Sequence, residues 1–303
     1  MSAREQLAAT LACGAVLAAA PWLLSDFLLA LVLSCLMYAA LAVSWAMFCG
    51  PTNYLSLATS AFFGLGAYVT AWSLESLPYG VAVLAGGLVG VAFAALIGAA
   101  VLHLRGAYFA VITFGLGELA LHLVTYTEKT FWHTAGRIIS DPPDNAAIYW
   151  TVLVLTLGAV ATAILVRSSR LGLALKGVGA DEERAQTLGV DTRLAKIAGF
   201  ALAAFFAGAL GAAVAVRWTY IEPASVFNPF IGFQTVLIAM IGGAQTLAGP
   251  MISAVVFSLL TELLRLQFPY AYLIVLGILL IVLVLYLPGG FASLVARWKQ
   301  ARA

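Results

Sequence analysis

Charged side chains are scarce in this sequence: aspartate, glutamate, lysine and arginine make up 9% of its 303 residues. A soluble globular domain averages about 25% charged residues and about 45–50% apolar ones. Here the hydrophobic residues reach 63%, and the mean hydropathy is +1.04. This composition excludes an ordinary soluble domain. It predicts an all-α, polytopic bundle of helices that crosses a lipid bilayer.

Residues that build catalytic and metal centres are equally few. The cysteines lie inside apolar runs without metal-type spacing, and the histidines lie on different segments; they are Cys13, Cys35, Cys49, His103, His122 and His133. The chain has no GxxxxGK[ST] phosphate loop, no HExxH and no CxxC motif. We therefore expect no catalytic residue, metal site or cofactor in this chain, and no enzyme. Work against a gradient would draw its energy from a partner or from an ion.

Apolar runs long enough to cross a bilayer recur along the whole chain. Because about 20 apolar residues span the hydrocarbon core as a helix, they predict about ten spans in a single transmembrane domain, residues 1–303. The predicted spans are 7–24, 28–49, 53–74, 79–102, 107–127, 148–166, 197–216, 230–247, 248–264 and 270–288. The first resembles a secretory signal, but Pro21 would directly follow the cleavage-like alanines, so we expect an uncleaved span. Glycine or proline interrupts 53–74 and the pair 230–264, which predicts broken helices.

The basic residues indicate how these spans are oriented. With the N-terminus inside and ten alternating spans, the inner side holds Arg4, Arg105, six basic residues of segment 167–196 and three of the C-terminal tail. The outer side holds only four basic residues and most of the acids. This distribution follows the positive-inside rule. It predicts that the N- and C-termini are cytoplasmic.

Segment 167–196, named here the island, holds ten of the 28 charged side chains. Its residues 180–188 favour a helix with acids in the first turn, and Gly189 can end that helix in a left-handed conformation. Ala185 and Leu188 are spaced to share one face. The island is either a solvated loop or a helix that docks on another protein. In the second case the contacts would be Asp181, Glu182, Glu183, Arg184, Ala185, Leu188 and Gly189.

Glu118 lies near the middle of span 107–127, and His122 follows one turn later. An ionisable residue at that depth is expensive, so it is a functional candidate that faces a cavity or a partner. It could instead stay neutral or paired and lock helices together. Proton coupling is a third possibility.

Two glycine-punctuated stretches, 50–57 and 241–250, occupy similar places in the two halves of the chain. Free backbone groups within a bilayer must be satisfied by protein or by a water-filled cavity. The stretches therefore predict broken helices beside a pathway, or close packing of helices through small residues. The pathway candidates are Ser56, Thr113, Glu118, Gly242 and Gly243.

Several motifs, in this order along a ten-span chain, resemble one family: the membrane permease subunit of branched-chain amino-acid-type ABC importers. The resemblance runs from about residue 35 to 295. It rests on Leu55-Ser56-Leu57, Ala61 to Tyr68, Leu104 to Ala110, Thr113 to Glu118, the island with Leu188-Gly189-Val190, and Gly242-Gly243 with Gly249-Pro250.

The resemblance implies a location in the bacterial inner membrane, and it implies the partners and the mechanism. A sister permease would complete the pore, two cytoplasmic ATPase subunits would bind ATP and magnesium, and a periplasmic binding protein would deliver the solute; no nucleic acid is implied. Residues 180–190 would be the coupling helix that seats in an ATPase groove. The island reads Arg184-Ala185-Gln186-Thr187 where relatives often have Ala-Ala-Glu-Ala, which suggests a dedicated ATPase.

The resemblance implies one class of importer but several possible solutes. The external motif is Thr134-Ala135-Gly136 rather than Thr-Gly-Gly, and relatives also carry urea, short amides and aromatic carboxylates besides branched-chain and other hydrophobic amino acids. The main alternative function is a proton-coupled secondary transporter centred on Glu118.

Overall fold

The structure is a computed structural model that describes residues 3–268, except 105, 135, 140 and 141, together with 274, 275, 277 and 278. Within these residues the chain is helical apart from loops and one two-stranded ribbon. Eight helical segments are long and apolar enough to cross a membrane: Arg4–Leu23, Asp26–Thr52, Tyr79–Val101, Ala107–Phe131, Asn145–Ser168, Thr192–Ala215, Pro223–Gly242 and Ala248–Gln267. This confirms an all-α, polytopic membrane protein.

The predicted count of about ten spans is not confirmed. Predicted span 53–74 contains α4 (Thr59–Ser73), a helix of 15 residues that is too short to cross a membrane alone. Predicted span 270–288 lies outside the described residues. The first predicted span consists of α1 (Ala3–Ala18) and α2 (Ala20–Leu23), which are separated at Ala19.

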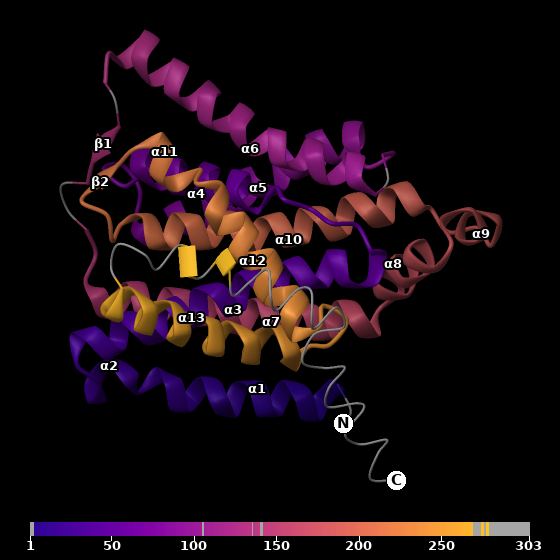
Figure 1. Ribbon diagram of the computed structural model, residues 1–303, viewed down its shortest axis with the longest axis horizontal. Helices are drawn as coiled ribbons and strands as arrows, with labels where there is room; N and C mark the ends of the chain where they lie inside the picture. The colour runs from indigo at the N-terminus through magenta and orange to yellow at the C-terminus, as the bar shows by residue number, and fades with distance from the viewer. Residues whose placement is uncertain are drawn as a thin grey trace.

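The long helices run side by side along the longest axis of the molecule (Figure 1). They are α3 (Asp26–Thr52), α5 (Tyr79–Val101), α6 (Ala107–Thr127), α7 (Asn145–Ser168), α10 (Thr192–Ala215) and α13 (Ala248–Gln267). The shorter helix α12 (Pro229–Gly242) runs obliquely to them. The short helices α8 (Arg170–Ala180) and α9 (Glu182–Thr187) project beyond one end of the bundle, and α1 begins at that same end.

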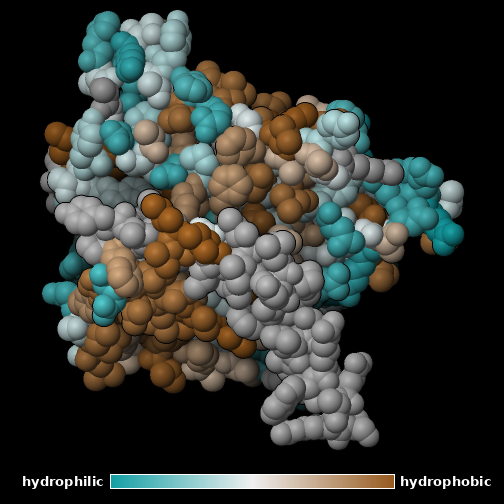
Figure 2. Space-filling model, viewed as in Figure 1, coloured by the Kyte–Doolittle hydropathy of each residue, from teal (hydrophilic) through white to brown (hydrophobic). Residues whose placement is uncertain are grey.

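At the opposite end lie the π-helix η1 (Glu128–Trp132), the strands β1 (Arg137–Ile138) and β2 (Tyr220–Ile221), and α11 (Pro223–Val226). The strands pair antiparallel. Side chains on the middle of the bundle are largely hydrophobic, whereas hydrophilic ones gather at the projecting α8–α9 end and around η1 and the strands (Figure 2). An apolar belt between two polar ends is the pattern of a protein that spans a bilayer.

Helix α10 packs closely against α4 and α5 through small residues. A methyl group at Gly66 of α4 would collide with the carbonyl oxygen of Gly208, and one at Gly211 would collide with the carbonyl oxygen of Phe63. In a membrane, close backbone approach of this kind replaces the hydrophobic effect as the source of helix association. The glycines of α4 and α10 therefore fix the centre of the bundle.

The segment that joins α3 to α4 explains the first break. Asn53 has a positive φ of 57° and ends α3, and residues 53–57 are not helical. The indole of Trp45 donates to the carbonyl oxygen of Ser56 at 2.8 Å, and the hydroxyl of Thr113 accepts from the backbone N–H of Leu57 at 3.0 Å. Neighbouring helices thus satisfy the backbone groups that the break frees, as the apolar surroundings require.

Candidate functional site

Helix α9 is capped at both ends, and the sequence predicted the glycine stop at its C-terminal end. The side chain of Asp181 accepts hydrogen bonds from the backbone N–H groups of Glu183 and Arg184, each at 3.1 Å. At the other end Gly189 has a φ of +83°. Its N–H donates to the carbonyl oxygen of Gln186, and that of Val190 donates to Ala185. This pair of bonds is a Schellman motif, so the predicted helix and its glycine stop are confirmed.

The apolar stripe predicted for this helix is wrong. Ala185 is 5% exposed and packs against Gly177 of α8, whereas Leu188 is 84% exposed. Because α9 folds back on α8, its inward face needs the small side chain of Ala185. Leu188 stands at the C-cap, where the chain leaves the helix. The exposed surface of α9 therefore contains Leu188 without Ala185.

Glu182, predicted as a partner contact, points into this chain instead. Its carboxylate pairs with Lys196 of α10, with 2.6 Å between Oε1 and Nζ, and the two side chains are only 8% and 5% exposed. The ammonium of Lys196 also donates to the carbonyl oxygen of Leu102 at 2.6 Å, at the end of α5. The sequence places Lys196 beside a span, but nothing in its spacing pairs it with Glu182 fourteen residues earlier.

Tyr54 completes this buried cluster. Its hydroxyl donates to Oε2 of Glu182 at 3.2 Å and accepts from Nζ of Lys196 at 3.3 Å. The ammonium also lies 5.2 Å from the centre of the Tyr54 ring, within cation–π range. The cluster Tyr54–Leu102–Glu182–Lys196, named here the clamp, therefore ties the start of α9 to α10, to the end of α5 and to the α3–α4 link.

A second connection joins the end of α3 to α8. The side-chain amide of Asn53 donates to the carbonyl oxygen of Gly179 at 3.1 Å. Gly179 lies so close to the backbone of Pro51 that a methyl group would collide with its carbonyl oxygen. The island is thus fixed to the bundle through backbone contacts as well as through the clamp.

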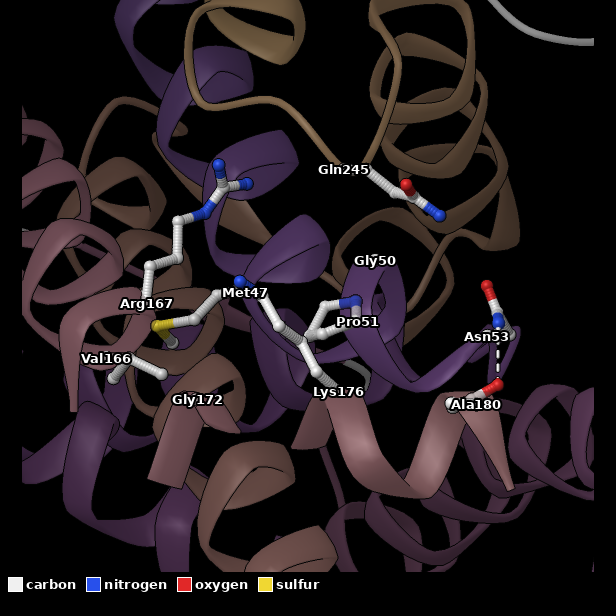
Figure 3. A pocket seen from close by; sticks show the side chains of 11 residues that line it. Met47, Gly50, Pro51, Asn53, Val166, Arg167, Gly172, Lys176, Ala180 and Gln245 are labelled. Atoms are coloured by element: carbon white, nitrogen blue, oxygen red, sulfur yellow. Dashed lines mark hydrogen bonds between the residues drawn. The ribbon is translucent and has the colours of Figure 1, made fainter. Parts of the chain in front are cut away.

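The two glycine-punctuated stretches meet beside this connection. Gly50 lies against the carbonyl of Ala244 in the loop between α12 and α13, and Arg167 donates from Nη2 to the carbonyl oxygen of Thr246 at 2.8 Å. Between them is a cavity of about 440 Å³, which Arg167 and Lys176 approach from α7 and α8 and Gln245 from the facing loop (Figure 3). The predicted breaks therefore converge on the island.

The family model for the permease component of the branched-chain amino acid transport system matches residues 27–284. The chain belongs to this family. It is 26% identical over 289 residues to the high-affinity branched-chain amino acid transport system permease protein LivM of Escherichia coli K12, with 84% of this chain and 67% of that protein covered. It is 25% identical over 288 residues, with the same coverage, to LivM of Salmonella typhimurium LT2. No solved structure matches.

Membership in a permease family confirms the resemblance and the expectation of a transport component rather than an enzyme. It does not favour the proton-coupled alternative. In this permease Glu118 is partly exposed on α6, and His122 is exposed. Among the described residues the side chain of Glu118 makes no hydrogen bond or ion pair. Its role stays a prediction.

The other pathway candidates of the permease have structural contacts. Thr113 bonds Leu57, the hydroxyl of Ser56 accepts from the N–H of Ala58 at 3.3 Å, and Gly242 packs against Gly249. Ser56 and Thr113 lie together at the first break, and Gly242 and Gly243 lie at the second. Their place on a solute pathway is untested by these contacts and stays a prediction.

Proposed function

We propose that this chain is the permease subunit of a binding-protein-dependent ABC importer for branched-chain or other hydrophobic amino acids. The family supports the class, and the relatives' names support the solute. A sister permease would supply the other half of the pathway, and a periplasmic binding protein would deliver the amino acid. Two cytoplasmic ATPase subunits would bind ATP and magnesium.

The observation that carries this proposal is the construction of α9. The helix projects from the bundle, with Asp181, Glu183 and Arg184 facing water and Leu188 84% exposed. Covering a leucine side chain contributes about 1.5–3 kcal/mol, so an apolar pocket on an ATPase would gain stability by enclosing Leu188. The charges around it would pair at the rim.

The inward side of the same helix suits a lever. A force on α9 would pass through the clamp to α10 and α5, and through Gly179 to the end of α3. The contacts of the clamp are short and largely buried, and the exposed bond from Asn53 to Gly179 adds a directional link, so α9 would move with the membrane helices rather than independently. Nucleotide-driven closure of the ATPases would then tilt the bundle and switch access.

In this arrangement the α8–α9 end faces the cytoplasm, together with the N-terminus and, we expect, the C-terminus. The ribbon β1–β2 and η1 face the periplasm across the inner membrane. The count of basic residues supports this orientation.

The test uses the complex assembled from this chain, its sister permease and its ATPases, with uptake and ATP hydrolysis measured in proteoliposomes. Replacing Leu188 by Glu places a charge in the proposed pocket, so we expect weaker ATPase association and an uptake loss of at least about ten-fold. Leu77→Glu, at the opposite end of the bundle, is the matched control and should retain both ATPase association and uptake. Unchanged association and uptake in L188E would exclude α9 as the coupling helix.

Uptake by this chain alone on a pH gradient, abolished by Glu118→Gln, would instead establish the secondary transporter.

A further inference from the structure

A groove of about 490 Å³ opens at the end of the bundle opposite α9. It is bounded by the start of α3 at Phe27, the start of α12 at Phe230, the segment after α10 at Arg217, and the end of α13 at Arg265. None of the pathway candidates from the sequence lines it. Its position, on the side where a binding protein would deliver its solute, makes its chemistry informative.

Three charged side chains line this groove: Arg217, Glu262 and Arg265. Within the described part of the chain, none of the three side chains forms an ion pair or a hydrogen bond. Arg217 and Arg265 are exposed, and Glu262 is half-buried. Two guanidinium groups and one carboxylate thus share a groove without a partner among the residues that the structure describes.

Neutral polar groups also line the groove. The hydroxyl of Tyr38 donates to Oε1 of Gln234 at 2.8 Å, which leaves the NH₂ of Gln234 as a donor. Ser258 is 6% exposed, and its Oγ has no hydrogen-bond partner in the described residues apart from the weak thiol of Cys35. A buried hydroxyl without a strong partner is costly unless a ligand or water meets it.

The remaining wall is apolar and includes Phe27, Leu31, Met37, Phe63 and Ile231. An apolar surface beside a small set of fixed polar groups is the usual construction of a small-molecule site. The volume is sufficient for an amino acid of the size of leucine together with several waters.

We propose that this groove is a receiving site for a zwitterionic amino acid with an apolar side chain. The α-carboxylate would bind the guanidinium groups of Arg217 and Arg265, because arginine pairs with carboxylates through two parallel hydrogen bonds. The α-ammonium would bind Glu262, and the side chain would lie on the apolar wall. A ligand with only a carboxylate would leave Glu262 unpaired, and urea or an amide would leave all three charges unpaired.

This inference rests on the proposed function for the route of the solute, but binding can be measured without transport. The experiment uses the purified full-length chain, alone and in the assembled complex, in phospholipid nanodiscs with radiolabelled L-leucine as the probe. We expect saturable binding that is weakened at least about ten-fold by Arg217→Gln and by Glu262→Gln. Glu75→Gln, an exposed acid at the same end of the bundle but outside the groove, is the matched control and should bind as the unmodified chain does.

Competition identifies the chemistry of the ligand. We expect 4-methylpentanoate, which lacks the ammonium, and 3-methylbutylamine, which lacks the carboxylate, each to compete at least about ten-fold more weakly than leucine. Equal competition by either compound, unchanged binding in R217Q and E262Q, or no saturable binding to chain or complex would overturn the receiving site. A complex that imports leucine without binding it in the groove keeps the proposed function and refutes only this inference. A chain that binds leucine in the groove but associates with no ATPase keeps this inference and refutes the proposed function.

Discussion

The clamp offers a quantitative test of how α9 is held, through replacement of Lys196 by Met. Removing one partner of a buried ion pair costs about 3–5 kcal/mol, because the other charge stays buried without compensation. The full range applies here, since the side chains of Lys196 and Glu182 are 5% and 8% exposed. The substitution also removes the donor to the carbonyl oxygen of Leu102. At about 2 °C per kcal/mol for a chain of this size, the expected fall in Tm is on the order of 10 °C.

The assay is thermal unfolding of the detergent-purified chain, followed by a double-mutant cycle. Glu182→Gln alone should also destabilise, because it leaves the ammonium of Lys196 buried without its counter-charge. The double variant K196M/E182Q should lose less stability than the sum of the two single variants, since it removes both charges together. The control is Arg184→Met, which breaks the exposed pair of Arg184 with Asp181 and should cost less than about 1 kcal/mol. Strictly additive losses in the cycle, or an equal loss in R184M, would refute the role of the buried pair.

Two further predictions follow from individual residues. Glu128 is 1% exposed, and its Oε2 accepts from the N–H of Gly136 at 3.0 Å and from the hydroxyl of Tyr68 at 3.3 Å. Glu128→Ala should therefore speed proteolysis of the 133–139 loop, whereas Glu128→Gln should behave more like the unmodified chain because its amide oxygen still accepts. Equal cleavage of the unmodified chain and both variants would contradict this role. Gly189→Val should lower the free energy of unfolding by about 1–2 kcal/mol, because a β-branched residue is strained at a φ of +83°. We expect this variant to associate more weakly with the ATPases in pull-downs, and Gly189→Asn to show a smaller loss. Full association of G189V would show that the Schellman turn is dispensable.

Local signals in the sequence predicted the features of the island that depend on neighbouring residues. The glycine after α9 ends the helix as predicted. Acids were predicted in the first turn of this helix, and one of the acids of the segment, Asp181, caps it. The breaks at Asn53 and Gly243 were also predicted, because glycine, proline and asparagine interrupt apolar runs there. These features follow from backbone geometry, which short sequence patterns encode well.

The sequence alone did not show which residues each side chain contacts. Spacing placed Ala185 and Leu188 on one face, but only the packing of α9 on α8 shows that Ala185 is buried. Glu182 was expected to face an ATPase because acids in a charged loop usually face solvent, and its pairing with Lys196 depends on how α10 returns to the bundle. Likewise, the charges of the groove lie in two separate parts of the sequence, Arg217 after α10 and the pair Glu262 and Arg265 on α13.

The clamp and the groove lie at opposite ends of the same two helices. Lys196 stands near the start of α10 and Arg217 just beyond its end, 21 residues later, which is about 32 Å along a helix. Helix α3 contributes Tyr38 to the groove, and its far end at Pro51 and Asn53 contacts α8. Helix α10 packs against α4 and α5 through close backbone contacts at its centre. It can therefore tilt together with them but cannot bend easily there. A displacement of α9 would therefore change the separation of Arg217 from Glu262 on α13. This arrangement would couple nucleotide-driven movement at the cytoplasmic face to release of an amino acid from the groove into the translocation pathway.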